Sequence, residues 1–245
     1  MQMQKHYIAA PITEAVIDLQ VEFLYEMTLS ILTDLKRSIK SDYPVCDEIV
    51  AVEGEIEAGS SVAARASQTL IGYRFSSGDR KQILQARLDG FTFSRLAPYD
   101  KWETFRDEAR RLWELYRAVA NPKSVNRVAV RYINRLNLPL PLSDFKDYLR
   151  TVPEVSPDLP QGLSDYFMQL QIPQEDLDGM LLLNEAIISP LGDNVISVLL
   201  DINLFCNGNF PSEEDMHWNL LEKFRVRKNE VFEACITDKT RGLIK

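Results

Sequence analysis

The chain has 245 residues, of which 45% are hydrophobic and 26% are charged, and its formal net charge at pH 7 is −8. A chain of this size and composition buries a substantial core and does not belong to the disordered class. Its long apolar stretches are interrupted by Asn, Asp or Glu well short of a membrane span, and its first residues lack the apolar core of a signal peptide. We therefore expect a cytoplasmic protein without a membrane partner.

Cysteine, histidine and glycine form no pattern that is typical of an enzyme. Cys46, Cys206 and Cys235 are too widely spaced to suggest a metal site, and we expect reduced thiols, mostly in the core. His6 and His217 have no evident acid–base partner, so surface or capping roles are expected. The sequence also lacks a glycine-rich phosphate loop and a nucleophile elbow. We predict no catalytic residue, metal site or cofactor.

The first half of the chain begins with a strand and continues with helices and short strands. Apolar residues from Ile17 to Phe23 alternate with polar ones, which predicts a half-buried strand over 14–23. The elements expected after it are a helix within 25–44, a strand over 47–58, a loop over 59–68, three short strands within 69–96 and a helix over 100–120.

The helix expected over 100–120 has a predicted start and a predicted buried face. Asp100 and Glu103 have the spacing of a capping box. Its apolar residues recur at helical spacing, which indicates one face against the core. That stripe consists of Trp102, Phe105, Ala109, Leu112, Trp113 and Tyr116.

The second half shows the same order of patterns. The expected elements are a strand over 125–138, a helix over 142–152, a proline-rich loop over 153–162, strands over 165–173, 179–188 and 194–205, and a long helix that begins near Ser212. The acidic "QEDLDG" at 174–179 is too short for a calcium loop and indicates a hairpin turn. The closing helix has the stripe Trp218, Leu221, Phe224, Val231 and Cys235.

The repeated order predicts an internal duplication. Strand, helix, three or four strands and helix recur at an offset of roughly 110 to 116 residues, which aligns Trp102 with Trp218. We expect an α+β fold in which residues 1–245 form a single compact domain of two pseudo-repeats, about 7–120 and 121–245. The two sheets would join into one curved antiparallel sheet with helices packed on one face. This layout is similar to the TATA-box-binding-protein-like topology, and a helix-grip-like sheet is the alternative.

Arg127, Arg131 and Arg135 lie four positions apart on the polar face of the strand over 125–138. At about 13 Å apart on one strand face, they have the spacing of contacts to an extended anion, which favours a nucleic-acid surface. Alternatively, the strand over 14–23 lies beside them and supplies Asp18 and Glu22 as internal ion-pair partners. The net charge of −8 favours internal pairing.

Charge is distributed unevenly along the chain. Residues 101–150 contain 11 Lys or Arg and 6 Asp or Glu, whereas residues 151–222 contain 13 acidic residues and no Lys or Arg. Such segments either neutralise each other within the fold or present complementary faces to a partner. Neutralisation within the fold is the simpler expectation.

A few polar residues interrupt strands that are otherwise apolar. Glu185 and Asp201 need partners if they face the core, and Arg87, Arg95 and the three ladder arginines are the candidates. These acids are alternatively expected to line a pocket with Tyr73, Tyr132 and Asn134. The candidate ligand- or partner-binding residues are Arg127, Arg131, Arg135, Tyr132, Asn134 and Glu185.

Four motifs, "PITEAVIDLQVEF", "DGFTFSRLAPYDKWETF", "VAVRYINRLNLP" and "FEACITDKTRGLI", resemble a sporadically distributed, uncharacterised bacterial protein family of about this length. The residues that carry the resemblance are Tyr99 and Trp102, the run Arg131–Tyr132–Ile133–Asn134, and Phe232, Ile236 and Thr237. The resemblance covers nearly the whole chain. It implies no activity, and the patchy distribution suggests an accessory or defence role.

The leading functional hypothesis is a non-enzymatic binding protein with a protein partner. The first alternative is a nucleic-acid-associated protein that uses the arginine-bearing strand. The second is a small-molecule-binding protein or an enzyme with a pocket near Tyr132, Asn134 and Glu185. A homo-oligomer is an open alternative in each case.

Overall fold

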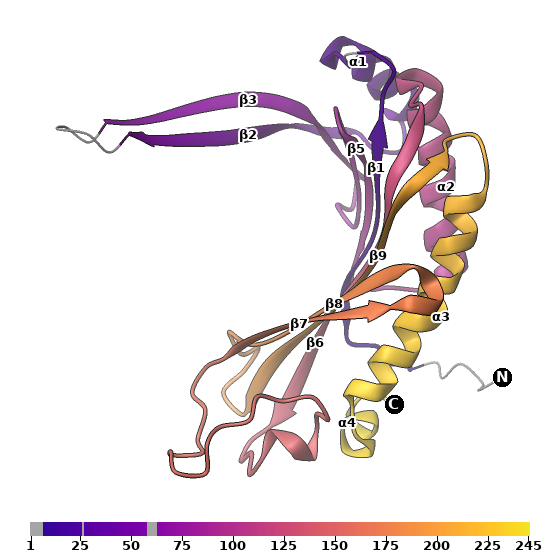
Figure 1. Ribbon diagram of the computed structural model, residues 1–245. Coiled ribbons are helices and arrows are strands. Elements are labelled where there is room, and N and C mark those ends of the chain that lie inside the picture. Colours follow the sequence, from indigo (N-terminus) through magenta and orange to yellow (C-terminus); the bar gives the residue numbers. More distant parts are fainter. Residues whose placement is uncertain (1–6, 26, 58–62) are drawn as a thin grey trace.

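The structure is a computed structural model that describes residues 7–25, 27–57 and 63–245, except for the side chains of residues 53–66. One antiparallel sheet of nine strands runs through the molecule in the order β2-β3-β4-β5-β1-β6-β9-β8-β7 (Figure 1). The strands are β1 (Ile12–Glu22), β2 (Val45–Glu57), β3 (Ala63–Ser76), β4 (Gln82–Arg87), β5 (Gly90–Leu96), β6 (Ser124–Pro139), β7 (Phe167–Gln174), β8 (Gly179–Ile188) and β9 (Val195–Pro211). The helices are α1 (Leu29–Ile39), α2 (Trp102–Ala120), α3 (Met216–Cys235) and α4 (Asp238–Leu243), with 3-10 turns η1 (Phe145–Asp147) and η2 (Glu175–Leu177). The expected α+β class with a single antiparallel sheet is confirmed.

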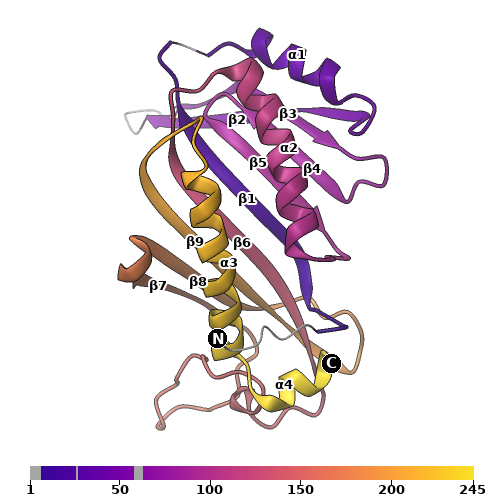
Figure 2. The ribbon, with the colours of Figure 1, turned by 90° about the vertical axis from the view of Figure 1, so that its right-hand side faces the viewer.

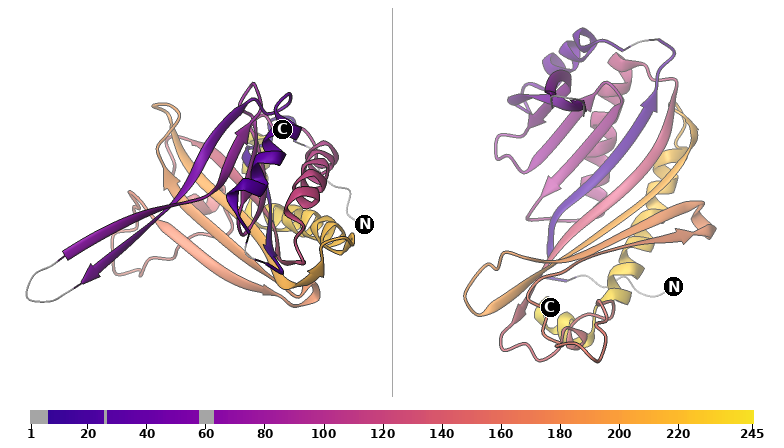
Figure 3. Two further views of the ribbon diagram at one scale, coloured as in Figure 1. Left: turned by 90° about the horizontal axis from the view of Figure 1, so that it is seen from above. Right: turned by 60° about the vertical axis from the view of Figure 1, so that its left-hand side comes forward.

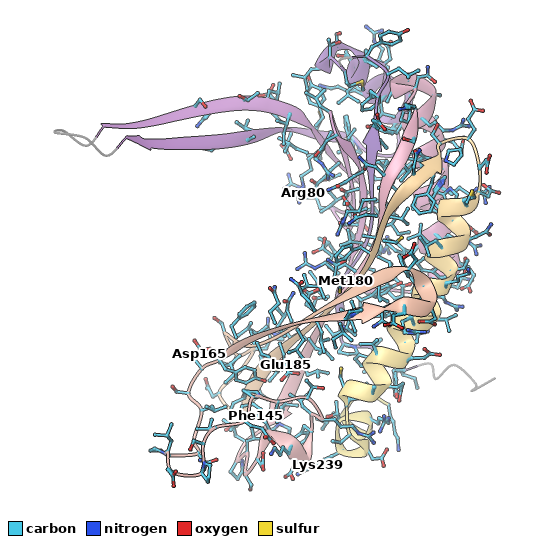
Figure 4. All side chains as sticks on the ribbon, viewed as in Figure 1. Arg80, Phe145, Asp165, Met180, Glu185 and Lys239 are labelled. Carbon is cyan, nitrogen blue, oxygen red and sulfur yellow. The ribbon has the colours of Figure 1, made fainter. Side chains whose placement is uncertain are left out.

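The sheet is curved, and the long helices α2 and α3 lie along its convex side (Figures 1 and 2). No helix within the described ranges lies on the concave side (Figures 1 and 3). Two parts of the chain project from the ends of the curve toward that side. We call the β2–β3 hairpin the upper arm, and the loops at 140–166 and 189–194 the lower arm (Figures 1 and 3). We call the concave side of the sheet between the two arms the hollow, and the side chains drawn in Figure 4 leave its middle open.

The core forms where the apolar face of the sheet meets the helices. In β6 the residues from Val128 to Leu138 that alternate toward the helices are 0–2% exposed, as the period-two pattern predicts. The predicted stripe of α2 is also buried, and in β1 Ile17, Leu19 and Val21 face the same layer. Burial of these side chains fixes which face of each strand is polar and turned to the concave side.

The centre of the sheet is the antiparallel pair of β1 and β6. Asp18 is opposite Ala129, and Gln20 is opposite Arg127. β5 pairs with the other edge of β1, and β9 with the other edge of β6. The expected proximity of strand 14–23 and strand 125–138 is confirmed, and it brings Asp18 close to the arginines.

Some element predictions were wrong for identifiable reasons. The helix expected over 142–152 is only the turn η1, because Leu149 leaves it to form a backbone bridge with Ile236. Within the loop expected over 59–68, strand β3 already begins at Ala63, because its backbone pairs with β2 as far as Glu57. In each case long-range backbone pairing overrides local propensity.

The starts of both long helices also differ from expectation. The N-cap of α2 is Lys101 and has no side-chain cap, so the predicted capping box of Asp100 and Glu103 does not form. α3 begins at Met216 rather than near Ser212, because the acidic run before it forms a turn. None of the helices in the described part of the chain is long and apolar enough to cross a membrane.

Candidate functional site

The concave face carries a band of polar side chains that begins on β1, β4, β5 and β6. Arg127 Nη1 donates to Asp18 Oδ2 at 3.0 Å, and Asp18 Oδ1 accepts from Arg87 at 3.2 Å and from Thr92 at 2.6 Å. Arg87 also pairs with Asp89 at 2.9 Å. The side chains of Arg87, Asp18 and Arg127 are only 15–21% exposed. Asp18 is therefore shared by two arginines in a partly desolvated cluster.

The band continues across the second half of the sheet. Arg131 donates from Nε and Nη2 to the two carboxylate oxygens of Asp201 at 2.8 and 2.7 Å. Asn184 donates to Asp201 at 2.9 Å, and Gln169 donates to Asn184 at 2.8 Å. The hydrogen bonds to Asp201 raise the pKa of Arg131. One chain of contacts thus links β6, β9, β8 and β7.

The third arginine of the ladder has a different environment. Arg135 Nη2 donates to the carbonyl oxygen of Ser189 and to Ser197 Oγ, the latter at 3.3 Å. Its Nε is buried without a hydrogen-bond partner, and no carboxylate pairs with it within the described ranges. Glu22, an expected partner of the ladder, pairs with Lys123 at 3.1 Å instead. Internal ion pairing therefore holds for Arg127 and Arg131 but not for Arg135.

The other predicted site residues lie on the opposite face of the sheet, under the helices. Tyr132 is fully buried, and its hydroxyl lies 2.9 Å from that of Tyr99. Asn134 is 2% exposed and donates to the carbonyl oxygen of Leu200 at 3.0 Å. Because side chains alternate across a strand, these residues cannot share a site with Arg131. Of the residues expected to share a pocket, Tyr132 and Asn134 are thus buried on this face, whereas Asp201 lies on the concave face with Arg131.

Glu185 is a fully buried acid on β8 (Figure 4). The hydroxyl of Tyr166 donates to Oε1 at 2.6 Å, whereas Oε2 has no hydrogen-bond partner among the residues that the structure describes. Burial raises the pKa of Glu185 from its ordinary value of 4.5 to about 7, against the lowering effect of the Tyr166 bond. No arginine pairs with Glu185 in the described ranges, because Glu185 faces the core rather than the concave side.

The uneven charge of the chain is partly neutralised inside the fold, as expected. Arg106 meets Glu222 at 2.6 Å, and Arg110 meets Asp215 at 2.6 Å, each joining α2 to the second half. The remaining acids of that half include several exposed carboxylates for which no ion pair is found in the described ranges. They are Asp158, Asp165, Glu175, Asp178, Asp193, Glu213 and Glu214.

His217 is the clearest wrong expectation among the polar residues. It is 1% exposed, and within the described part of the chain neither ring nitrogen has a hydrogen-bond partner. The ring packs edge-on against Trp113 at 5.6 Å and lies 5.4 Å from Trp218. Burial lowers its pKa from 6.5 to about 4. His6, the second histidine, lies outside the described residues.

Lys228 is a feature that the sequence analysis missed. Its amine lies 3.9 Å from the centre of the Tyr132 ring, in cation–π contact under the sheet. Burial, together with the nearby Arg225, lowers the pKa of Lys228 to about 7. The sequence spacing could have indicated this, because Lys228 is four residues from both Phe224 and Phe232 and therefore lies on the buried face of α3.

The arrangement contains no recognisable catalytic set in the described part of the chain. All three cysteines are free, and Cys206 and Cys235 are buried with raised pKa values, which makes them poor nucleophiles. No group of His, Cys, Asp or Glu that could hold a metal ion is found among the residues described. The concave face presents paired charges and side-chain amides that can form hydrogen bonds.

Comparisons with protein-family models, curated proteins and solved structures find no match to this chain. The resemblance to a sporadic bacterial family therefore stays a prediction from the motifs.

Proposed function

We propose that the protein is a non-enzymatic binding protein whose concave sheet face receives a protein partner. The observation that carries this proposal is that two of the three arginines on that face already form ion pairs within the protein. Arg127 and Arg131 are both paired with carboxylates that are at most 19% exposed. A surface that holds a polyanion depends on cations free to release counterions, and these two are already neutralised.

The shape of the concave side favours a macromolecule over a small ligand. The upper and lower arms project on either side of the hollow, and Figure 4 labels Arg80 and Met180 within it and Asp165 in the lower arm. The exposed acids Asp158, Asp165 and Asp193 also belong to the lower arm. Complementary charge steers association, so the expected partner presents a basic surface.

The test is site-specific photo-crosslinking in cells of the source organism. A photoreactive amino acid at Met180 faces the hollow, and the matched control replaces Val226, which is 52% exposed on α3. We expect a protein adduct from position 180 and none from position 226, and we expect Asp165→Asn to reduce its yield. Equal adducts from both positions, or turnover of a metabolite by the purified protein, would overturn the proposal.

The alternative function is association with nucleic acid through Arg127, Arg131 and Arg135. What favours it is Arg135, which has no carboxylate partner in the described ranges, and Arg131, whose side chain is 45% exposed. Binding should then fall steeply with salt, and Arg131→Glu should weaken it. A mobility-shift series without any shift at low salt would remove this alternative.

We also infer that the molecule consists of two related halves with a TATA-box-binding-protein-like topology. Supporting this, β1 and β6 pair at the centre, flanked by β5 and β9, and α2 and α3 follow those outer strands in the chain. The second half differs from the first in having the turn η1 where the first half has the helix α1, and four strands instead of five. An experimental structure in which β6, β9 and α3 do not superpose on β1, β5 and α2 would contradict the inference.

Three further proposals concern the location, the biological role and the oligomeric state of the protein. A cytoplasmic location agrees with three free cysteines, because that compartment keeps thiols reduced. An accessory or defence role rests on the family resemblance alone. Homo-oligomerisation is the case in which the partner in the hollow is a second copy of the chain, and the crosslinked adduct then has twice the mass of the protein.

A further inference from the structure

The strand β7 forms one border of the sheet, and in the described ranges it pairs with β8 alone (Figure 2). The amide of Ile187 donates to the carbonyl oxygen of Tyr166 at 3.2 Å, which continues the register of the two strands by one residue. Residue pairs of an antiparallel ladder alternate between bonded and non-bonded ones. The backbone groups of Phe167, Gln169 and Gln171 therefore point away from β8, toward the open edge.

Pro173 has the same orientation as these three residues. This agrees with its chemistry, because a proline has no N–H and would cost the sheet a hydrogen bond at a position bonded to β8. Pro173 interrupts the open edge only at its far end. The N–H and C=O groups of Phe167, Gln169 and Gln171 thus form a row without backbone partners in the described part of the chain.

The side chains of β7 are uncharged, and two of them are exposed apolar groups. The sequence of the strand is FMQLQIPQ, and Phe167 and Ile172 are 68% and 39% exposed. Because side chains alternate across a strand, Phe167 shares the concave face with Gln169, whereas Ile172 lies on the other face. A strand added to this edge would therefore find an apolar neighbour on each face.

The opposite border of the sheet is β2, and its composition is different. The strand β2 carries five acids, which are Asp47, Glu48, Glu53, Glu55 and Glu57. Charged residues on an edge strand oppose pairing with another chain, and natural proteins protect exposed edges in this way. One border of the sheet is thus rich in charge and the other has none, which favours the β7 edge as a surface for strand addition.

Exposed acids lie at both ends of the β7 edge. Asp165 precedes the strand, Glu175 and Asp178 follow it, and none of the three forms an ion pair within the described ranges. A second copy of β7 in either direction would bring like charges together at these ends, which is unfavourable. A strand with basic residues at both ends would instead meet opposite charges.

We propose that the open edge of β7 binds an extended segment of a partner protein that is uncharged in its middle and basic at both ends. The segment adds one strand to the nine-stranded sheet through main-chain hydrogen bonds to Phe167, Gln169 and Gln171. The inference goes beyond the proposed function, because this surface is the border of the sheet and does not require a partner in the hollow.

The test is fluorescence anisotropy of the labelled peptide KTVTVTK, titrated with the full chain. We expect this peptide to bind, and we expect weaker binding of ETVTVTE, which has acidic ends. Weaker binding is also expected of KTVTVTK that is N-methylated at every central residue, because it lacks donors for a ladder. Gln171→Pro removes one outward N–H and should weaken binding about tenfold. Gln171→Ala keeps that N–H and, as the matched control, should bind like the unmodified protein.

Circular dichroism checks the fold of both variants, and the N-methylated peptide tests the unmodified protein if Gln171→Pro does not fold. Light scattering, which we expect to show a monomer, tests whether a second copy occupies the edge. The proposal is overturned if KTVTVTK does not bind at millimolar concentration, if either altered peptide binds equally well, or if Gln171→Pro binds like Gln171→Ala. A dimer of the unmodified protein that Gln171→Pro dissociates would also overturn it.

Discussion

Arg131 and Asp201 form a two-point ion pair between the neighbouring strands β6 and β9, with both hydrogen bonds at or below 2.8 Å. Asp201 is 1% exposed, whereas the side chain of Arg131 is 45% exposed. The pair therefore joins a buried carboxylate to a cation at the surface of the hollow. This relationship gives Arg131 a partner within the fold.

Asp201→Asn tests the energetic role of this pair. The variant keeps the shape of the side chain but leaves Arg131 without an anion. We expect the free energy of unfolding to fall by about 1–3 kcal/mol, less than for a fully buried pair because Arg131 is partly solvated. Urea denaturation measures the change, with Asp193→Asn, an exposed acid of the lower arm, as the control. Equal stability of the two variants would show that the pair contributes nothing.

Glu185 should make the protein less stable as the pH rises. Its pKa is about 7 in the folded chain against an ordinary 4.5, so the unfolded chain releases this proton first. The free energy of unfolding then falls by up to about 3 kcal/mol between those two pH values and does not recover at higher pH. Glu185→Gln removes the ionisation, so its stability should fall less from about pH 5 to about pH 8. Parallel denaturation profiles of variant and unmodified protein would contradict this.

His217 should make the protein less stable as the pH falls, which is the opposite of the effect of Glu185. Its pKa is about 4 in the folded chain against 6.5 ordinarily, so the unfolded chain takes up this proton first and stability falls as the pH drops from 6.5 toward 4. His217→Phe keeps a ring between Trp113 and Trp218 and removes two nitrogens that lack partners. We expect the variant to match or exceed the unmodified protein at neutral pH and to be clearly more stable in acid. Thermal unfolding followed by circular dichroism at several pH values decides; an unchanged acid sensitivity would refute the prediction.

Gly72 should be irreplaceable at the base of the upper arm. A Cβ there would lie 2.3 Å from the carbonyl oxygen of Ala86 and 2.8 Å from Cα of Arg87, both backbone atoms of β4. Gly72→Ala should destabilise the protein by about 1–3 kcal/mol, because the strands must separate. Gly78→Ala, where a Cβ meets nothing within 4 Å, is the matched control. Calorimetric melting of both variants gives the comparison, and a similar loss in both would contradict the steric explanation.

The sequence was sufficient for features that depend on periodicity. The alternation in β1 and β6 and the stripe of α2 were read correctly, because burial imposes a period of two on strands and of 3.6 on helices. The face of the arginine ladder followed from the same alternation. The helix over 142–152 and the loop over 59–68 were wrong, because their structure depends on backbone pairing with Ile236 and with β2.

The candidate site was predictable only in part. Asp18 was named as a partner of the ladder from the expected pairing of the two strands, and it does pair with Arg127. The separation of Arg131 from Tyr132 and Asn134 was also implicit in the alternation along β6. The contact of Lys228 with Tyr132 was not foreseen, because it joins α3 to β6, which are distant in the chain, although the spacing of Lys228 from Phe224 and Phe232 indicated a buried position.

The sequence by itself determined which residues are apolar, at what period they recur and hence which face of each element is buried. The tertiary structure alone decided which charges meet, because a carboxylate finds its arginine through the order and register of strands. Asp201 pairs with Arg131 since β9 lies beside β6. Local sequence preferences do not indicate which strand will lie beside β6. The ion pairs of the arginines, and the hollow that these residues line, therefore form only when the sheet is assembled.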